Sequence, residues 1–370
     1  MAATPPTSSP DSAPLLAALA AVIDPTTGRD LVSTKAVRQA RIDAGRASIE
    51  VELGYPARSQ EPALRQALEA AARTVPGVTA VDVRISTQVV AHAVQRGVPL
   101  LPGVKNIVAV ASGKGGVGKS TTAANLALAL AAEGARVGLL DADIYGPSQP
   151  MMMGITGRPE TEDGKTMEPM ENHGVQVMSI GFLVNPDQAM IWRGPMATQA
   201  LDQLLRQTNW HDLDYLIVDM PPGTGDIQLT LSQRVPLTGA VIVTTPQDIA
   251  LLDARKGVAM FDKVGVPILG LVENMAAHVC SNCGHVEHIF GEGGGQRYAV
   301  ERGIDYLGAL PLDIAIRLQA DGGRPTVVAE PDGPVAGQYK AIARQLAVRI
   351  AARAKDFSSK FPTITVSRDT

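Results

Sequence analysis

Residues 106–121 read Asn-Ile-Val-Ala-Val-Ala-Ser-Gly-Lys-Gly-Gly-Val-Gly-Lys-Ser-Thr, and this stretch decides the fold. Its first six residues form a short apolar run, typical of a strand that is buried on both faces of a parallel sheet. Residues 113–120 match the pattern Gly-x-x-x-x-Gly-Lys-Ser/Thr, and a stretch of good helix formers follows at 121–133. Because a strand precedes the glycines and a helix follows them, the stretch predicts a phosphate-binding P-loop.

The chemistry of this loop follows from its backbone. Glycines let consecutive N–H groups face a phosphate, and the helix that opens here adds its positive N-terminal end. Lys119 is expected to reach the β- and γ-phosphates of ATP, and the Ser120 hydroxyl to bind Mg²⁺. A glycine-rich turn with an incidental lysine is the alternative, and the strand–loop–helix context disfavours it. The predicted nucleotide-binding residues of the loop are Gly113, Lys114, Gly115, Gly116, Val117, Gly118, Lys119, Ser120 and Thr121.

Four further apolar runs resemble the strand before the loop. They lie at 136–140, 213–218, 239–244 and 267–272. Strands of this kind, separated by helical stretches such as 338–353, predict an α/β domain over residues 105–355 with a doubly wound, mainly parallel sheet.

Carboxylates stand at the ends of two of these runs. Asp219 follows one run, and Asp141 and Asp143 follow another. The carboxyl ends of parallel strands meet at one edge of the sheet, where ligands bind. We therefore expect Asp219 to bind Mg²⁺ together with Ser120. A single carboxylate at a strand end is often structural, but three of them after a P-loop favour a site.

The N-terminal part of the chain has a different pattern. A helix is expected over 14–23, a half-buried strand over 47–53, a helix over 61–74 and alternation again at 81–85. These elements predict a small α+β domain over 14–86, joined by a linker over 87–104. Residues 1–13 are rich in Pro, Ser and Thr and are expected to be disordered, and the tail 356–370 to be loose.

Composition bounds the class of protein. The 370 residues carry 33 Lys+Arg and 37 Asp+Glu, a net charge of −4, and 45% are hydrophobic. This balance argues against disorder and gives no support to nucleic-acid binding. No basic secretory n-region is visible, and the apolar runs are too short for a membrane span. We expect a cytoplasmic protein that binds neither membrane nor nucleic acid.

Lys114 is an additional lysine at the start of the loop. In the form Lys-Gly-Gly-x-Gly-Lys-Ser it resembles the deviant Walker A motif of the MinD/Mrp class of ATPases. The resemblance implies a homodimer in which Lys114 reaches the partner's nucleotide, and a water-activating role for Asp143. It also implies that Asn274 and Pro311 hold the adenine. The alternatives are a solvated Lys114 and an Asn274 that serves only as a turn residue.

Both cysteines of the chain lie in one motif, Cys280-Ser-Asn-Cys283. A thioredoxin-like redox pair would lie at a helix start near a first strand. A zinc site would recruit His278, His285 or His288, but the spacing is unusually compact. An unliganded structural pair is a third reading. Iron–sulfur clusters commonly need four thiolates, so a symmetric dimer of this chain would supply a complete set. We favour this last reading, a cluster site shared between two chains.

Together these motifs closely resemble the Mrp/ApbC family of iron–sulfur cluster carrier ATPases. The resemblance implies an ATP-hydrolysing homodimer that holds a [4Fe–4S] cluster between Cys280 and Cys283 of both subunits. It further implies a cluster assembly scaffold as donor and apo iron–sulfur proteins as recipients. Ser281 departs from the proline frequent in the family. The supporting segments are residues 113–121, 192–196, 219–226, 273–275 and 293–295, with Asp24-Pro25 of the N-terminal domain resembling an accessory domain.

Two alternatives remain for the whole chain. One is a MinD/ParA-like positioning ATPase, which needs a membrane-targeting helix or a basic patch. The tail 356–370 supplies neither, and this reading leaves the cysteines unexplained. The other alternative is a regulatory ATPase that binds zinc.

Overall fold

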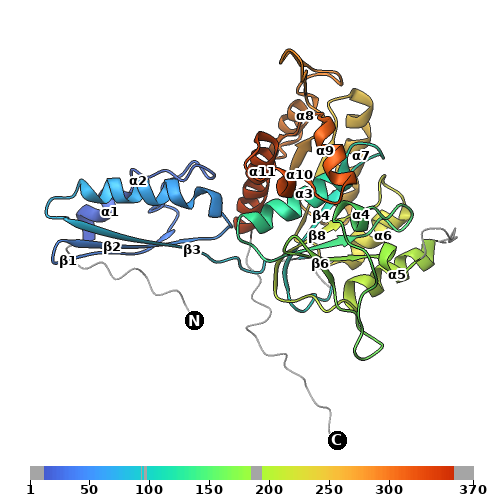
Figure 1. The fold of residues 1–370 in the computed structure, drawn as a ribbon, viewed down its shortest axis with the longest axis horizontal. Coiled ribbons are helices and arrows are strands. Elements are labelled where there is room, and N and C mark those ends of the chain that lie inside the picture. The colour runs from blue at the N-terminus through green and yellow to red at the C-terminus, as the bar shows by residue number, and fades with distance from the viewer. Residues whose placement is uncertain (1–11, 93, 96–97, 185–193, 354–370) are drawn as a thin grey trace, which may run out of the picture.

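A computed structural model describes residues 12–92, 94–95, 98–184 and 194–353 (Figure 1). The expectations for residues 1–11 and the tail 356–370, and the resemblance at Trp192 and Arg193, lie outside these described residues. Within the described ranges, every helix is too short or too polar to form a membrane span.

The larger domain is built on an eight-stranded sheet with the strand order β13-β10-β9-β4-β8-β5-β7-β6. Neighbouring strands are parallel except for the antiparallel edge pair β6–β7. This confirms the expected doubly wound, mainly parallel α/β fold. The five predicted runs correspond to β4 (Val104–Ala111), β5 (Val137–Asp141), β8 (Leu213–Asp219), β9 (Gly239–Thr244) and β10 (Ile268–Glu273).

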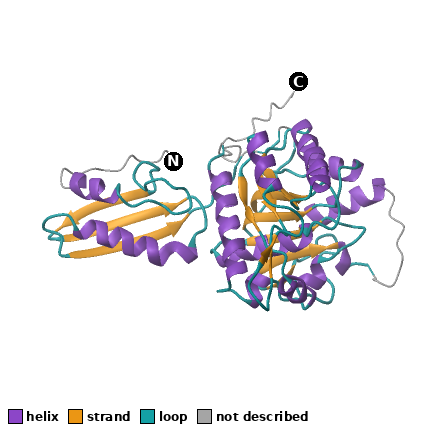
Figure 2. Ribbon diagram, turned by 90° about the horizontal axis from the view of Figure 1, so that it is seen from above, coloured by secondary structure: helices purple, strands orange, loops and turns teal. Residues whose placement is uncertain are grey.

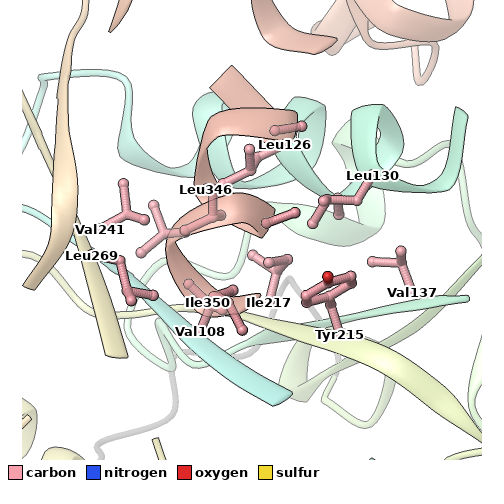
Figure 3. Packing of buried hydrophobic residues seen from close by; sticks show 14 of the residues in the cluster. Val108, Leu126, Leu130, Val137, Tyr215, Ile217, Val241, Leu269, Leu346 and Ile350 are labelled. Carbon is pink, nitrogen blue, oxygen red and sulfur yellow. The ribbon is translucent and has the colours of Figure 1, made fainter. Parts of the chain in front are cut away.

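Helices cover the sheet, and its five central strands are buried over most of their length. The P-loop helix α3 (Lys119–Ala132) packs against α11 (Pro334–Ala351) and against the central strands. Figure 3 shows Leu126 and Leu130 of α3 beside Leu346 of α11, above Ile217 and Tyr215 of β8. The remaining elements are α4 (Gln149–Met152), β6 (Met170–Asn172), β7 (Val175–Ser179), η3 (Ile180–Phe182), α5 (Gly194–Arg206), α6 (Asp226–Arg234), α7 (Asp248–Lys263), β11 (His278–Val279), β12 (Val286–Glu287), α8 (Gly294–Arg302), β13 (Tyr306–Ala309), α9 (Ile314–Asp321) and α10 (Thr326–Ala329).

The N-terminal domain is a three-stranded sheet with two helices on one face (Figure 2). β1 pairs antiparallel with β2, and β2 pairs parallel with β3. The elements are α1 (Ala13–Leu19), β1 (Val37–Asp43), β2 (Arg46–Leu53), η2 (Arg58–Gln60), α2 (Glu61–Arg73) and β3 (Ala80–Thr87).

Two details correct the sequence analysis. The helix expected over 14–23 ends at Leu19, and Ile23 instead forms an isolated bridge with Asp30. The reason is the turn at Asp24, whose carboxylate accepts hydrogen bonds from the Thr26 N–H and the Tyr55 hydroxyl. The predicted linker 87–104 also overlaps β3 and β4 by one residue each.

The segment between the domains packs on the larger one. The Gln95 side chain donates a hydrogen bond to the Ser232 carbonyl oxygen and accepts one from the Leu237 N–H. Val89 and Leu101 are buried. The described residues of this segment are therefore part of the folded surface of the P-loop domain, although the segment was expected to be only a connection.

A buried carboxylate joins the two domains. Glu133, directly after α3, accepts hydrogen bonds from the Ser59 N–H at 2.9 Å, the Ser59 hydroxyl at 2.6 Å and the Arg344 guanidinium at 2.5 Å. The Arg58 N–H donates to the Glu133 carbonyl oxygen. The side chain of Glu133 is fully buried, so its charge depends on these partners.

Replacing Glu133 with Ala is expected to undock the N-terminal domain. Arg344 would keep a charge with only 13% of its side chain exposed, and breaking such a pair costs about 3–5 kcal/mol. Calorimetry should show a lower melting temperature or a split transition. The control is Glu52→Ala, which removes the exposed ion pair with Arg38 and should cost at most about 1 kcal/mol. Equal effects of the two substitutions would contradict the docking role.

Candidate functional site

Glycine is required in the loop between β4 and α3. Gly116 and Gly118 have φ angles of 82° and 79°, in the left-handed region that L-residues with a Cβ disfavour. At Gly113 a Cβ would lie 2.1 Å from the backbone of Asp253 in α7. The predicted loop therefore takes a conformation that only these glycines permit, with the start of α3 directly behind it.

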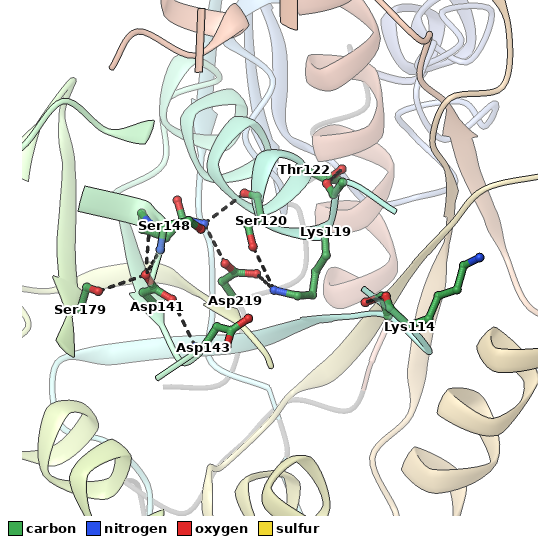
Figure 4. A network of polar contacts seen from close by, with 12 residues as sticks. Lys114, Lys119, Ser120, Thr122, Asp141, Asp143, Ser148, Ser179 and Asp219 are labelled. Carbon is green, nitrogen blue, oxygen red and sulfur yellow. Dashed lines mark hydrogen bonds and ion pairs between the residues drawn. The ribbon is translucent and has the colours of Figure 1, made fainter. Parts of the chain in front are cut away.

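Lys119, Ser120 and Asp219 meet at the end of the central strands (Figure 4). The Lys119 ammonium lies 2.5 Å from Asp219 Oδ1 and 3.0 Å from Ser120 Oγ. Lys119 is 6% exposed and Asp219 is fully buried, so each charge compensates the other. The structure thus brings together three residues that the sequence analysis assigned to one site.

Asp141 and Asp143 stand at the end of the neighbouring strand. Asp141 accepts hydrogen bonds from the Asp143 N–H and the Ser179 hydroxyl. Burial and then the charge of Asp219 raise the pKa of Asp141 above its usual range. Burial also raises the pKa of Asp143, although the Lys119 charge opposes the effect. Asp141 is therefore an internal anchor, whereas Asp143 is half-buried and lines a cavity of about 420 Å³.

The other predicted residues lie around the loop in different roles. Lys114 points away from Lys119 in Figure 4, and its ammonium makes no hydrogen bond or ion pair to another described residue. Asn274 is buried, and its side-chain amide donates to the Val117 carbonyl oxygen at 2.9 Å. Pro311 is half-buried and lies two residues after the end of β13. Asn274 thus holds the loop backbone.

Gln149 is a site residue that the sequence analysis missed. It is fully buried, and its side-chain amide donates to Asp219 Oδ2 and to the Ser120 carbonyl oxygen. Its position in the Gly-Pro-Ser-Gln loop after Asp141 was the only signal, because a glutamine carries no chemistry that a spacing rule detects.

The oxygen ligands at this site suit a hard cation. A serine hydroxyl and a carboxylate are oxygen ligands of the kind that Mg²⁺ takes beside substrate phosphates. In the structure the Lys119 ammonium contacts both of these oxygen ligands and supplies the positive charge between them. Ser120 and Asp219 therefore fit the expected magnesium ligands.

Cys280 and Cys283 lie in a small exposed hairpin between β11 and β12. The Cys280 N–H donates to the His285 carbonyl oxygen, and the Gly284 N–H donates back to the Cys280 carbonyl oxygen. Hydrogen bonds from the backbone N–H groups of Asn282 and Cys283 lower the pKa of the Cys280 thiol. Cys280 is half-buried and Cys283 is exposed. The hairpin therefore presents two thiols, and the surroundings of Cys280 favour its thiolate, the form that binds metals.

No third metal ligand joins the two cysteines from the described part of the chain. Among those residues, no group of three or more His, Cys, Asp or Glu side chains is arranged to hold a metal ion. His278 and His288 each have one ring nitrogen at a backbone carbonyl, of Leu312 and Ala276 respectively. A metal at the thiols would thus need ligands from elsewhere.

Family models and known relatives match most of the chain. Residues 103–347 match the family described as NUBPL iron-transfer P-loop NTPase, and residues 13–83 match a family described as iron-sulfur cluster assembly protein. An iron-sulfur cluster carrier protein of Pseudomonas fragi is 61% identical, covering 75% of this chain and 97% of the relative. That of Escherichia coli K12 is 51% identical, covering 89% of this chain and 88% of the relative.

Solved structures give the same architecture. A nucleotide-binding protein of Archaeoglobus fulgidus, in complex with ADP, has a TM-score of 0.55 and 38% identity, covering 64% of this chain and 91% of that one. The cell division ATPase MinD of Pyrococcus furiosus has a TM-score of 0.50 at 22% identity, covering 65% of this chain and 98% of that one, and shares the fold. With its P-loop, its carboxylates and its cysteine hairpin, the chain belongs to the family of iron–sulfur cluster carrier P-loop NTPases.

Proposed function

We propose that this chain is an ATP-hydrolysing homodimer that carries a [4Fe–4S] cluster bound by Cys280 and Cys283 of both subunits. It receives the cluster from an assembly scaffold in the cytoplasm and transfers it to apo-proteins. ATP binds at the P-loop with Mg²⁺ on Ser120 and Asp219, and its hydrolysis changes how the dimer holds the cluster.

The cysteine hairpin is the observation that carries this proposal. A thiolate-bound [4Fe–4S] cluster takes four sulfurs, and the described residues offer two thiols and no further ligand set. Because the hairpin is exposed, a second copy can bring its own pair to the same cluster. A cluster held at such a surface is also open to a recipient protein, as a carrier requires.

ATP binding would change which positive charge neutralises Asp219. In the structure the Lys119 ammonium neutralises Asp219. On ATP binding, Lys119 would turn to the phosphates, and Ser120 and Asp219 would hold a Mg²⁺ that supplies the positive charge Asp219 then lacks. Asp143, half-buried at the edge of the site, orients the attacking water, and Lys114 of the partner neutralises charge that develops on the phosphates. Asn274 and Pro311 are proposed to flank the adenine.

One strand links the two sites. Strand β10 ends at Glu273, and the next residue, Asn274, holds the P-loop carbonyl of Val117. The cysteine hairpin begins a few residues later, and the Ala276 N–H between them is held by the Leu310 carbonyl oxygen. A displacement of the loop on nucleotide binding therefore reaches the base of the hairpin through a short, hydrogen-bonded segment.

Anaerobic reconstitution followed by native mass and metal analysis tests the proposal. We expect a dimer with one cluster, or about two irons per chain, since four irons are shared by two subunits. One tightly bound zinc per monomer and no bound iron would contradict the proposal. Binding of lipid vesicles or DNA upon ATP addition, without bound iron, would favour a positioning ATPase.

Mixing two inactive variants tests the trans role of Lys114. Lys114→Ala subunits should bind ATP but lose hydrolysis, because the partner's site lacks its second lysine. Asp143→Ala subunits should lose hydrolysis through their own site. In a mixed dimer one composite site regains both groups, so the ATPase rate should rise to about a quarter of wild type if subunits mix randomly. Mixed dimers confirmed by native mass spectrometry that stay inactive would contradict the trans arrangement.

A further inference from the structure

Gln149 connects three parts of the nucleotide site. Its side-chain nitrogen donates to Asp219 Oδ2 at 2.8 Å and to the Ser120 carbonyl oxygen at 3.1 Å. Its backbone N–H donates to Asp141 Oδ2 at 3.1 Å. One fully buried residue thus touches the first turn of the P-loop helix and the ends of both β5 and β8.

The two oxygens of Asp219 have different partners. Oδ1 faces the Lys119 ammonium, which is also 3.0 Å from the Ser120 hydroxyl, whereas Oδ2 faces Gln149. When Lys119 turns to the phosphates of ATP, Oδ1 loses its partner and Oδ2 keeps the Gln149 amide. The carboxylate is then held with Oδ1 toward Ser120.

A neutral amide is the side chain that suits this position. Asp141 and Asp219 are both buried, so a charged donor would compete with Mg²⁺ for Asp219, and a third carboxylate would add repulsion. The Gln149 carbonyl oxygen is also buried and has no hydrogen-bond partner among the described residues. A water of a hydrated cation would supply one, since bound Mg²⁺ usually keeps several waters.

We propose that Gln149 is a positioning residue for Mg²⁺, which holds Asp219 and Ser120 so that both face one cation. This proposal rests on the function proposed above, because it requires that ATP bind as its magnesium complex. Gln149 itself need not touch the nucleotide. Its substitution should therefore change the metal dependence of nucleotide binding and leave metal-free binding nearly unchanged.

The test is the affinity for a fluorescent ATP analogue, measured across a magnesium titration and in EDTA. Gln149→Met keeps the volume and removes the donor, and it should raise the Mg²⁺ concentration for half-maximal enhancement about tenfold or more, as for other residues that orient metal ligands. Affinity in EDTA should change less than twofold. Gln149→Glu keeps the shape of the side chain but adds a charge beside Asp219. It should therefore raise the Mg²⁺ concentration for half-maximal enhancement further than Gln149→Met does.

Gln176→Met is the matched control. Gln176 lies on β7, where its side-chain amide donates to the His211 carbonyl oxygen, and its replacement should leave both affinities as in wild type. A Gln149→Met protein with wild-type magnesium dependence would overturn the proposal, as would an equal loss of affinity with and without metal. If Gln149→Met does not fold, the Gln149→Glu titration decides in the same way.

The wild-type titration separates the two proposals. A wild-type protein that binds no ATP, or binds it equally with and without Mg²⁺, would refute the nucleotide part of the proposed function. A wild type with strong magnesium enhancement and a variant that retains it would refute only the role of Gln149.

Discussion

Cys280→Ala and Cys283→Ala are each expected to abolish cluster binding while leaving ATP affinity unchanged. Either change leaves a dimer with two thiols, too few for a [4Fe–4S] cluster that takes four. The hairpin is exposed and lies outside the P-loop, so nucleotide binding should not change. Iron content and the charge-transfer absorption after anaerobic reconstitution measure the loss.

Ser281→Ala is the control for the hairpin. It alters a residue between the two cysteines and removes no sulfur, so the iron content should stay at the wild-type value. A single-cysteine variant that keeps wild-type iron would contradict the shared site. If zinc is the true ligand, the wild type should be colourless with one metal per chain, and substitution of His285 or His288 should release it.

Lys119→Ala is expected to lower the rate of ATP hydrolysis by roughly 10²–10³-fold or more, because phosphoryl transfer depends on neutralising charge at the phosphates. Iron binding should survive, since Cys280 and Cys283 lie on a separate hairpin. The measurement is the turnover rate at saturating ATP, beside the iron content of the same sample. Normal turnover would refute the assignment of the nucleotide site.

The same substitution has a structural effect that needs its own control. Without Lys119 the fully buried Asp219 keeps only neutral partners, which costs about 3–5 kcal/mol of stability. The double variant Lys119→Ala/Asp219→Asn removes the unpaired charge and should recover much of the melting temperature without recovering hydrolysis. Recovery of hydrolysis in the double variant would mean that the single variant fails through instability.

The parts of the fold that depend on local pattern could be predicted from the sequence. Continuous apolar runs located five central strands, because a strand covered on both faces has no polar side. The P-loop could be predicted because its backbone conformation requires glycine at fixed positions, and this spacing is visible in the sequence. The meeting of Lys119, Ser120 and Asp219 followed from the rule that ligands lie at the carboxyl ends of parallel strands.

The rest depends on contacts between distant residues or on short, irregular elements. Strand β1 was missed because its register shifts between Val37 and Gln39, which breaks the alternation of buried and exposed residues. The edge strand β13 has four residues, too few to show a period. Gln149 and Glu133 owe their roles to partners far along the chain, and neither residue type signals a site by itself.

The P-loop helix holds a phosphate-binding loop at one end and the N-terminal domain at the other. Its 14 residues span roughly 21 Å, and Glu133 just beyond them is satisfied largely by Ser59 and Arg344. In evolutionary terms, a lineage that lost the N-terminal domain would keep Glu133 at the negative end of this helix but lose its partner Ser59. Across this family, we therefore expect an acidic residue at position 133 only in proteins that keep the N-terminal domain.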